Sequence, residues 1–249
     1  MRNPIQKFYD FLDRPIFPWA RIVLALLCIP LGLSVTAPLW RISMEAPQYP
    51  RGLSMEIHSY SIKGGHDGRD LEEINTLNHY IGMRHLSEDE IPDLGWMPFA
   101  LGILMILTLR VAAIGNVRGL VDHTVLMTYV LGFLAVRFIY RMYVYGHDLD
   151  PRAPFNVEPF MPVVIGTKQI ANFTTHGTPL IGTYYILAFS TGVGVVMFWH
   201  LIAGRRAAQR AEKAAAAVRA SNSERPPAKP TVTEPASAIS TEAEAKATS

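Results

Sequence analysis

The chain has 249 residues, of which 49% are hydrophobic and 18% are charged, and its formal net charge is +2. Its mean hydropathy of +0.17 is too high for a soluble domain that also carries so polar a C-terminal tail. The composition therefore excludes an ordinary soluble protein and predicts an integral membrane protein. We expect a lipid bilayer as its surroundings and no nucleic acid as a partner.

Residues 1–18 mix aromatic and aliphatic side chains with charges, which predicts a cytoplasmic amphipathic segment on the inner leaflet. The small residues at Val35-Thr36-Ala37 would also fit a signal-peptide cleavage site. The long leader of mixed charge favours a first span that is retained. The only cysteine, Cys28, lies in this span, so no disulfide within one chain is expected.

Four segments are long and apolar enough to cross roughly 30 Å of hydrocarbon at about 1.5 Å per residue. They predict an all-α integral membrane protein with four transmembrane helices in a membrane domain over 19–203. Residues 204–249 are predicted to form a cytoplasmic helical extension and a disordered tail, because Ala, Arg and Glu give way to Pro, Ser and Thr. The four predicted spans are 19–40, 96–114, 120–145 and 179–203.

The basic residues predict the orientation of the spans. Arginines and lysines gather before the first span, around the second connection and after the fourth span, which places both termini in the cytoplasm of a bacterial inner membrane. The first and third connections, 41–95 and 146–178, carry acids that match or outnumber their basic residues. We predict that both connections face the periplasm.

The two outer loops are predicted to fold together into a small, irregular and possibly α+β extracytoplasmic cap. A period-two run over 53–62, followed by a turn at Gly64-Gly65 and a helical pattern, indicates a strand and then a helix in loop 41–95. Loop 146–178 is dense in proline, so we expect it to be ordered but irregular.

The helical pattern in the first outer loop carries His79 and Met83, which share one face at helical spacing. A projection at about 100° per residue places them, with Glu72 and Asn75, nearly opposite the apolar stripe. Imidazole and thioether together suit soft copper ions. The pattern therefore predicts either a copper-ligand pair or a packing contact with the second outer loop.

Further ligand-type side chains, His147 and Asp148, stand at the outer end of the third span, and His66 lies in the first outer loop. We predict a copper site built from His79 and Met83, with these three residues as possible further ligands. Neutral imidazole and thioether accept Cu(I), whereas carboxylates favour Cu(II) or harder ions. Six of the eight histidines fall on the outer side, although exposed loops hold histidine readily.

Two other kinds of site compete with copper. Histidines near the ends of the third and fourth spans resemble bis-histidine haem ligands, but 24 residues separate the two in each span, about 36 Å along a helix, which places both pairs beyond the hydrocarbon. Arg137 and Arg141 lie one turn apart within the third span. A structural ion pair with a nearby acid is favoured there over a transport path.

Several longer motifs lie within residues 40 to 185: Ala46-Pro47-Gln48-Tyr49-Pro50-x-Gly52-Leu53, Leu71-x-x-Ile74-Asn75-x-Leu77-Asn78-His79-Tyr80-Ile81-Gly82-Met83, Tyr145-Gly146-His147-Asp148-Leu149-Asp150-Pro151 and Gly166-x-Lys168-Gln169-x-x-Asn172-Phe173. In these motifs the chain resembles a family of uncharacterised bacterial membrane proteins that often stand in the genomic company of nitrous oxide reductase maturation and copper-handling proteins. The resemblance implies an association with copper-centre assembly. Asp148 stands where relatives are expected to carry an amide.

We therefore predict a membrane-anchored accessory protein that binds or presents copper at its extracytoplasmic face for the assembly of a periplasmic cuproenzyme. A periplasmic copper protein or maturation factors would be its partners. The alternative is a non-catalytic membrane scaffold or subunit of a respiratory or maturation complex. An enzyme is a third possibility, although the spacing nominates no nucleophile–base pair.

Overall fold

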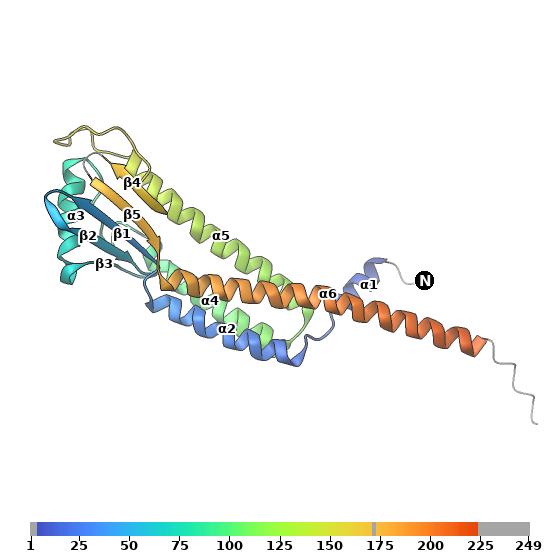
Figure 1. Cartoon of the computed structure of the whole chain (residues 1–249). Helices are drawn as coiled ribbons and strands as arrows, with labels where there is room; N and C mark the ends of the chain where they lie inside the picture. The colour runs from blue at the N-terminus through green and yellow to red at the C-terminus, as the bar shows by residue number, and fades with distance from the viewer. Residues whose placement is uncertain (1–3, 171–172, 224–249) are drawn as a thin grey trace, which may run out of the picture. The chain divides into compact units, whose positions relative to one another are not determined.

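The computed structural model describes residues 4–170 and 173–223. Among them, four helices are long and apolar enough to cross a membrane, which confirms the predicted number. The predicted tail beyond residue 223 lies outside the described residues. The chain divides after Arg206 into two compact units, and α6 crosses this boundary. The helices of the bundle are α1 (Pro4–Leu12), α2 (Pro18–Thr36), α4 (Asp93–Ile114), α5 (Val117–His147) and α6 (Ile181–Ser223) (Figure 1).

The membrane helices are apolar on all sides, which is typical of helices surrounded partly by protein and partly by lipid. One set of side chains fills the centre of the bundle, where Leu24, Leu101 and Phe189 are fully buried. Another set points outward, and Phe99 and Val136 keep more than 60% of their surface exposed. Large apolar surfaces of this kind are compatible with contact to a bilayer.

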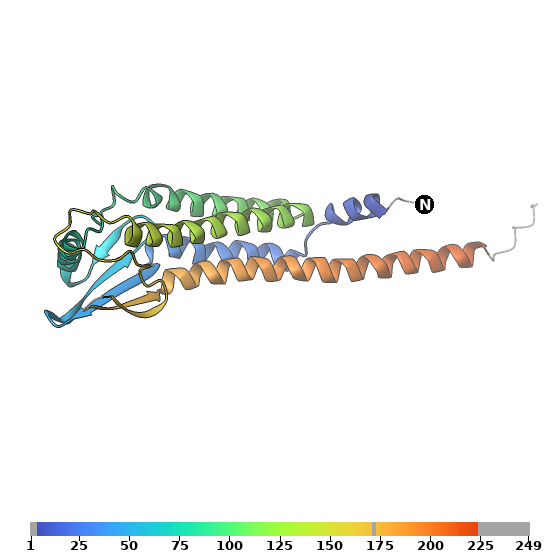
Figure 2. The same ribbon diagram turned by 90° about the horizontal axis from the view of Figure 1, so that it is seen from above.

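At one end of the helices lies a small cap, which comprises a sheet, helix α3 (Arg69–Tyr80) and the segments 81–92 and 148–165 (Figure 2). The sheet is antiparallel with strand order β3-β2-β1-β5-β4. Its central pair joins the two outer loops, because Ile42 of the first loop lies opposite Gly177 of the second. The strands are β1 (Trp40–Ala46), β2 (Tyr49–Ile57), β3 (Ile62–Gly64), β4 (Gly166–Ile170) and β5 (Phe173–Pro179).

The expected order of a strand followed by a helix is confirmed in the first outer loop, where β2 and β3 precede α3, but the period-two run over 53–62 is interrupted at 58–61. The prediction for the second loop is wrong in its last part. Residues 148–165 are irregular, as the prolines require, but the β4–β5 hairpin follows them. The last proline before the hairpin is Pro162, so the backbone N–H groups beyond it can donate to a sheet.

Helix α3 is tied to the sheet by polar contacts, of which one centres on a buried carboxylate. Asp70, only 4% exposed, accepts hydrogen bonds from the backbone N–H of Ser54 (2.8 Å) and from Nδ1 of His66 (2.8 Å). At the start of β2, the Tyr49 hydroxyl donates to the Glu73 carboxylate at 2.7 Å, and this hydrogen bond raises the pKa of Tyr49. These contacts fix the axis of α3 against β2.

The end of α3 depends on Gly82, which has a φ of +76°. Its carbonyl accepts the backbone N–H of Asp150 at 2.8 Å, so the turn also joins the two outer loops. A Cβ at this position would lie 2.7 Å from the Asp150 carbonyl oxygen. Glycine is therefore required both by its backbone angle and by the close approach of the second loop.

Replacing Gly82 with alanine is expected to destabilise the cap by about 1–3 kcal/mol, because the left-handed backbone and the clash with Asp150 both oppose a side chain. Thermal unfolding in mild detergent measures the effect. Gly95→Ala is the matched control, since a Cβ there meets open space. Equal midpoints for the two variants would contradict this role of Gly82.

Candidate functional site

An apolar cavity of about 540 Å³ lies beneath the cap. The inner face of the sheet forms its roof through alternate residues such as Trp40, Ile42 and Met44 of β1. Helix α3, segments 81–92 and 148–165 and the cap ends of α4, α5 and α6 form the remaining walls. The volume falls within the range of about 300–1,000 Å³ that small-molecule sites occupy.

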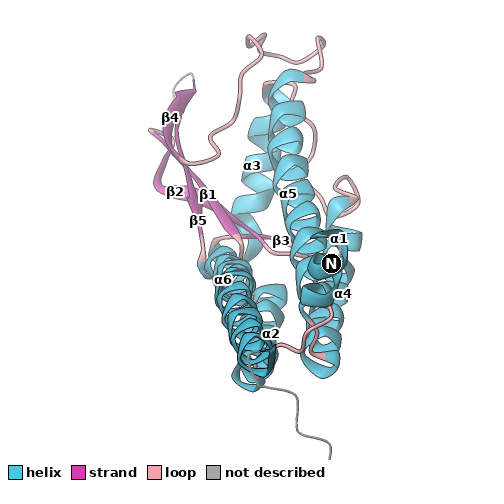
Figure 3. Cartoon of the chain, turned by 90° about the vertical axis from the view of Figure 1, so that its right-hand side faces the viewer, coloured by secondary structure: helices cyan, strands magenta, loops and turns pink. Residues whose placement is uncertain are grey.

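The cavity continues to the exposed apolar surface of the bundle. It is lined by Ala135 and Ile139 of α5 and by Leu187 and Ser190 of α6, which lie within the candidate spans. Ile139 is 50% exposed and Leu187 is 52% exposed, so both also belong to the outer surface. Figure 3, which looks along the helices, shows the sheet on the side of the bundle where α5 and the first part of α6 lie. The cavity therefore opens sideways between α5 and α6.

Methionine is prominent in the walls. Five of the ten methionines of the chain line the cavity, and they come from the sheet, the segment after α3, α4 and α5. Unbranched thioether side chains adapt to ligands of irregular shape and have polarisable sulfur atoms. The walls can therefore adjust to a flexible apolar molecule. The five residues are Met44, Met55, Met83, Met97 and Met142.

One group of charges lies at the wall formed by α4 and α5. Asp93, the first residue of α4, accepts two hydrogen bonds from Arg137, one from Nε at 2.9 Å and one from Nη2 at 3.0 Å. The Nε of Arg141 donates to the same carboxylate at 2.7 Å. The three side chains are 14–30% exposed, and all of them line the cavity. Arg137 thus forms an ion pair, as expected, and its acid is Asp93, whereas Asp148 pairs with Arg84.

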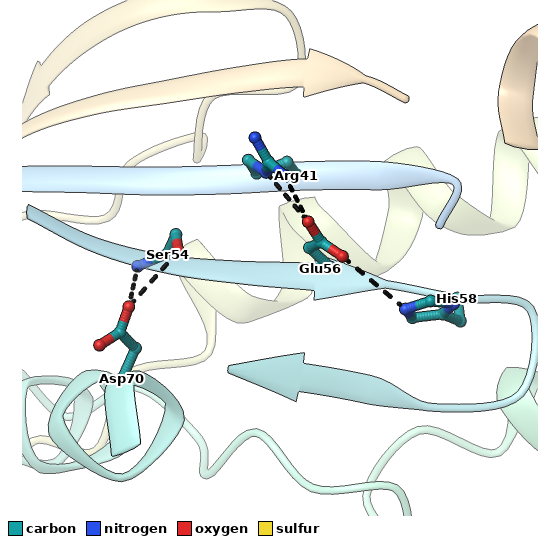
Figure 4. A network of polar contacts seen from close by, with 5 residues as sticks. All are labelled: Arg41, Ser54, Glu56, His58 and Asp70. Atoms are coloured by element: carbon teal, nitrogen blue, oxygen red, sulfur yellow. Dashed lines mark hydrogen bonds and ion pairs between the residues drawn. The ribbon is translucent and has the colours of Figure 1, made fainter. Parts of the chain in front are cut away.

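Two buried polar side chains face the cavity with an unused group. The Nδ2 of Asn78, a residue 6% exposed, has no hydrogen-bond partner within the described part of the chain. His58 contacts the Thr36 carbonyl through Nδ1 at 3.2 Å, while its Nε2 lies 3.9 Å from Glu56, beyond hydrogen-bond distance (Figure 4). Leaving such groups unpaired costs about 1–3 kcal/mol each, so a ligand with polar atoms would find partners here.

The structure separates the surroundings of His79 and Met83. Helix α3 ends at Tyr80, so the projection that placed the two residues on one helical face does not extend to Met83. His79 is exposed beside Tyr80, whereas Met83 packs into the apolar cluster of the cap and lines the cavity. The expectation that Met83 lies off the apolar surface is wrong, because Gly82 turns the chain inward.

The other predicted ligands have partners of their own. His66 contacts Asp70, Asp148 forms an ion pair with Arg84, and His147 stacks on Tyr143 with ring centroids 3.8 Å apart. The Arg84–Asp148 pair shows that the two outer loops meet. Among the residues that the structure describes, no group of three or more His, Cys, Asp or Glu side chains is placed to hold a metal ion. The copper site thus remains a prediction.

Comparison with known proteins adds no functional information. No protein-family model and no curated protein sequence matches the chain. The cavity cannot be recognised from the sequence because its walls come from residues far apart in the chain, although the alternation of apolar residues in β1 and β2 marks the roof.

Asn75 also differs from its predicted place on the polar face of α3. It is buried, donates through Nδ2 to the Leu86 carbonyl at 3.0 Å and accepts from the Leu86 N–H at 2.7 Å. The amide thereby holds segment 81–92 against α3. Asn75 is therefore a structural residue, which positions Leu86, itself a lining residue of the cavity.

Truncation of Asn75 to alanine is expected to cost about 1–3 kcal/mol of cap stability, since it leaves both backbone groups of Leu86 unpaired in a buried place. His79→Ala, on the exposed side of the same helix, should change the stability by no more than about 0.5 kcal/mol. Chemical denaturation followed by circular dichroism compares the two. A larger effect for His79→Ala would show that the assignment of structural roles is reversed.

Proposed function

We propose that this protein binds a lipidic molecule in the cavity beneath its cap and that the molecule enters from the bilayer between α5 and α6. The observation that carries the proposal is the sideways opening, where Ala135, Ile139, Leu187 and Ser190 belong at once to the cavity and to the candidate spans. A hydrocarbon chain can pass from lipid into such a cavity without crossing water. On the predicted topology, the protein would hold the molecule at the periplasmic face.

Polar groups, and not the apolar walls, must decide which lipid the cavity binds. Burying a methylene from water yields about 0.8 kcal/mol, but a chain that moves from a bilayer into an apolar cavity exchanges one apolar environment for another. The walls therefore provide fit and little net affinity. Specific binding needs hydrogen bonds or charges, and the cavity offers Asn78 and the Asp93 cluster for that purpose.

Trp40 provides a direct test, because its ring lines the cavity and packs on Phe138 with ring centroids 5.1 Å apart. The full chain, with its other three tryptophans replaced by phenylalanine, is titrated in mild detergent with phospholipid whose acyl chains carry bromine. Bromine quenches indole fluorescence at short range. We expect saturable quenching of Trp40 near one lipid per protein.

Two neighbouring substitutions on α5 separate entry to the cavity from contact with bulk lipid. Ala135→Phe should weaken the quenching titration by about tenfold, because a bulky side chain overfills the opening. Val136→Phe is the control, since Val136 is 64% exposed and does not line the cavity. Equal curves for the two variants, or unsaturable quenching in the parent, would refute the proposal.

Copper binding is a second candidate function, and the observation that favours it is the set of five methionines in the cavity walls. Thioether sulfur suits Cu(I), and Met83 belongs both to this set and to the pair with His79 nominated by the sequence. In this proposal the protein presents copper to a periplasmic cuproenzyme. The same cavity could serve either ligand.

Metal content after copper loading under reducing conditions and desalting tests this second function. We expect near-stoichiometric copper in the parent and its loss in His79→Ala/Met83→Leu, because leucine keeps the packing but removes the thioether. Met127→Leu, which lies in the bundle core outside the cavity, is the control and should retain copper. Absence of copper from the parent would remove this candidate.

A further inference from the structure

The charges at the cavity wall do not balance. Two guanidinium groups, Arg137 and Arg141, share the single carboxylate of Asp93, which leaves one positive charge uncompensated within the cluster. The other titratable side chains of the lining, His58 and Tyr145, supply no negative charge at neutral pH. The cavity therefore combines apolar walls with an excess cation.

The position of the excess cation suits an anionic group held at the membrane surface. Arg137 and Arg141 lie one turn apart near the cap end of α5, and Asp93 begins α4, so the cluster stands at the end of two candidate spans. Charged side chains at such ends lie at the depth of lipid headgroups. The headgroups of the adjacent leaflet are thus the nearest source of anions.

The geometry of the cluster leaves donors for a further partner. Arg137 engages Asp93 through two nitrogen atoms, whereas Arg141 engages it through Nε alone. The terminal N–H groups of Arg141 are not part of this ion pair. A guanidinium group offers five N–H donors in a planar fork that matches phosphate oxygens. Arg141 is accordingly the side chain equipped to hold a phosphate while Arg137 keeps Asp93 in place.

We propose that the molecule bound beneath the cap is an anionic phospholipid of the adjacent leaflet, with its phosphate on Arg141 and one acyl chain in the cavity. The proposal rests on the proposed function, because it names the ligand of the same cavity. It adds a headgroup preference that an apolar cavity alone would not have. Phosphatidylglycerol represents the anionic class, and phosphatidylcholine is the zwitterionic comparison.

The experiment repeats the Trp40 quenching titration with brominated phosphatidylglycerol and brominated phosphatidylcholine of identical acyl chains. We expect the parent protein to bind the anionic lipid about fivefold more tightly, which is the effect of one arginine near a charged membrane surface. Sodium phosphate, compared with sodium chloride at equal ionic strength, should not displace the lipid. Displacement by phosphate alone would show a site for a free anion and overturn the lipid assignment.

Two substitutions change the excess charge in opposite directions. Arg141→Gln removes the excess positive charge, while Arg137 and Asp93 stay joined by two hydrogen bonds. The preference for phosphatidylglycerol should therefore disappear. Asp93→Asn adds a second uncompensated charge and should increase the preference. Arg84→Gln removes a cap arginine that does not line the cavity and should leave the preference unchanged.

The outcomes separate the two proposals. Quenching of Trp40 by both lipids with equal affinity would overturn the headgroup assignment and leave the lipid-binding cavity intact. No saturable quenching by either lipid would refute the cavity's function itself. A preference that survives Arg141→Gln, or that falls equally in Arg84→Gln, would also overturn the role given to Arg141.

Discussion

The architecture of the cap depends on the pairing of β1 with β5. These strands come from loops separated by two membrane spans, and their hydrogen bonds join the loops into one sheet in which Trp40 lies opposite Pro179. Since α2 leads into β1 and β5 leads into α6, the sheet is also fixed to two helices of the bundle. The cavity lies between this sheet and the cap ends of α4, α5 and α6.

The membrane part of this fold could be predicted from the sequence because hydrophobic length is a local property. The four spans, and the order of a strand and a helix in the first outer loop, follow from runs and periods of neighbouring residues. The β4–β5 hairpin does not, since β5 is held in the sheet by β1, which lies more than a hundred residues earlier, and the short strand β4 pairs only with β5. Proline density correctly indicated irregular structure but could not indicate where that structure ends.

In the candidate site too, features set by neighbouring residues could be predicted, whereas contacts between distant residues could not. A charged residue within a span costs free energy, and for this reason the sequence marks Arg137 as a residue that needs an acidic partner. That partner is Asp93, which lies at the start of another helix. The helical projection of His79 and Met83 assumed that α3 continues past Tyr80, whereas Gly82 ends it and turns Met83 toward the cap core. A periodic pattern therefore predicts a shared face only as far as the helix itself extends.

The polar side chains of the cap fall into two groups that differ in how they are satisfied. Asp70 and Asn75, which hold α3 and segment 81–92 in place, have partners on both sides. Asn78 and His58, which line the cavity, each keep one group without a hydrogen bond within the described residues. If Asn78 and His58 served packing alone, apolar residues in their places would avoid the free-energy cost of burying polar atoms without hydrogen bonds. Among the described residues, Ser61 Oγ and His123 Nδ1 also lack a partner, and neither residue lines the cavity. A missing partner therefore does not by itself mark a ligand site, but Asn78 and His58 are the two such side chains that offer polar atoms to a molecule in the cavity.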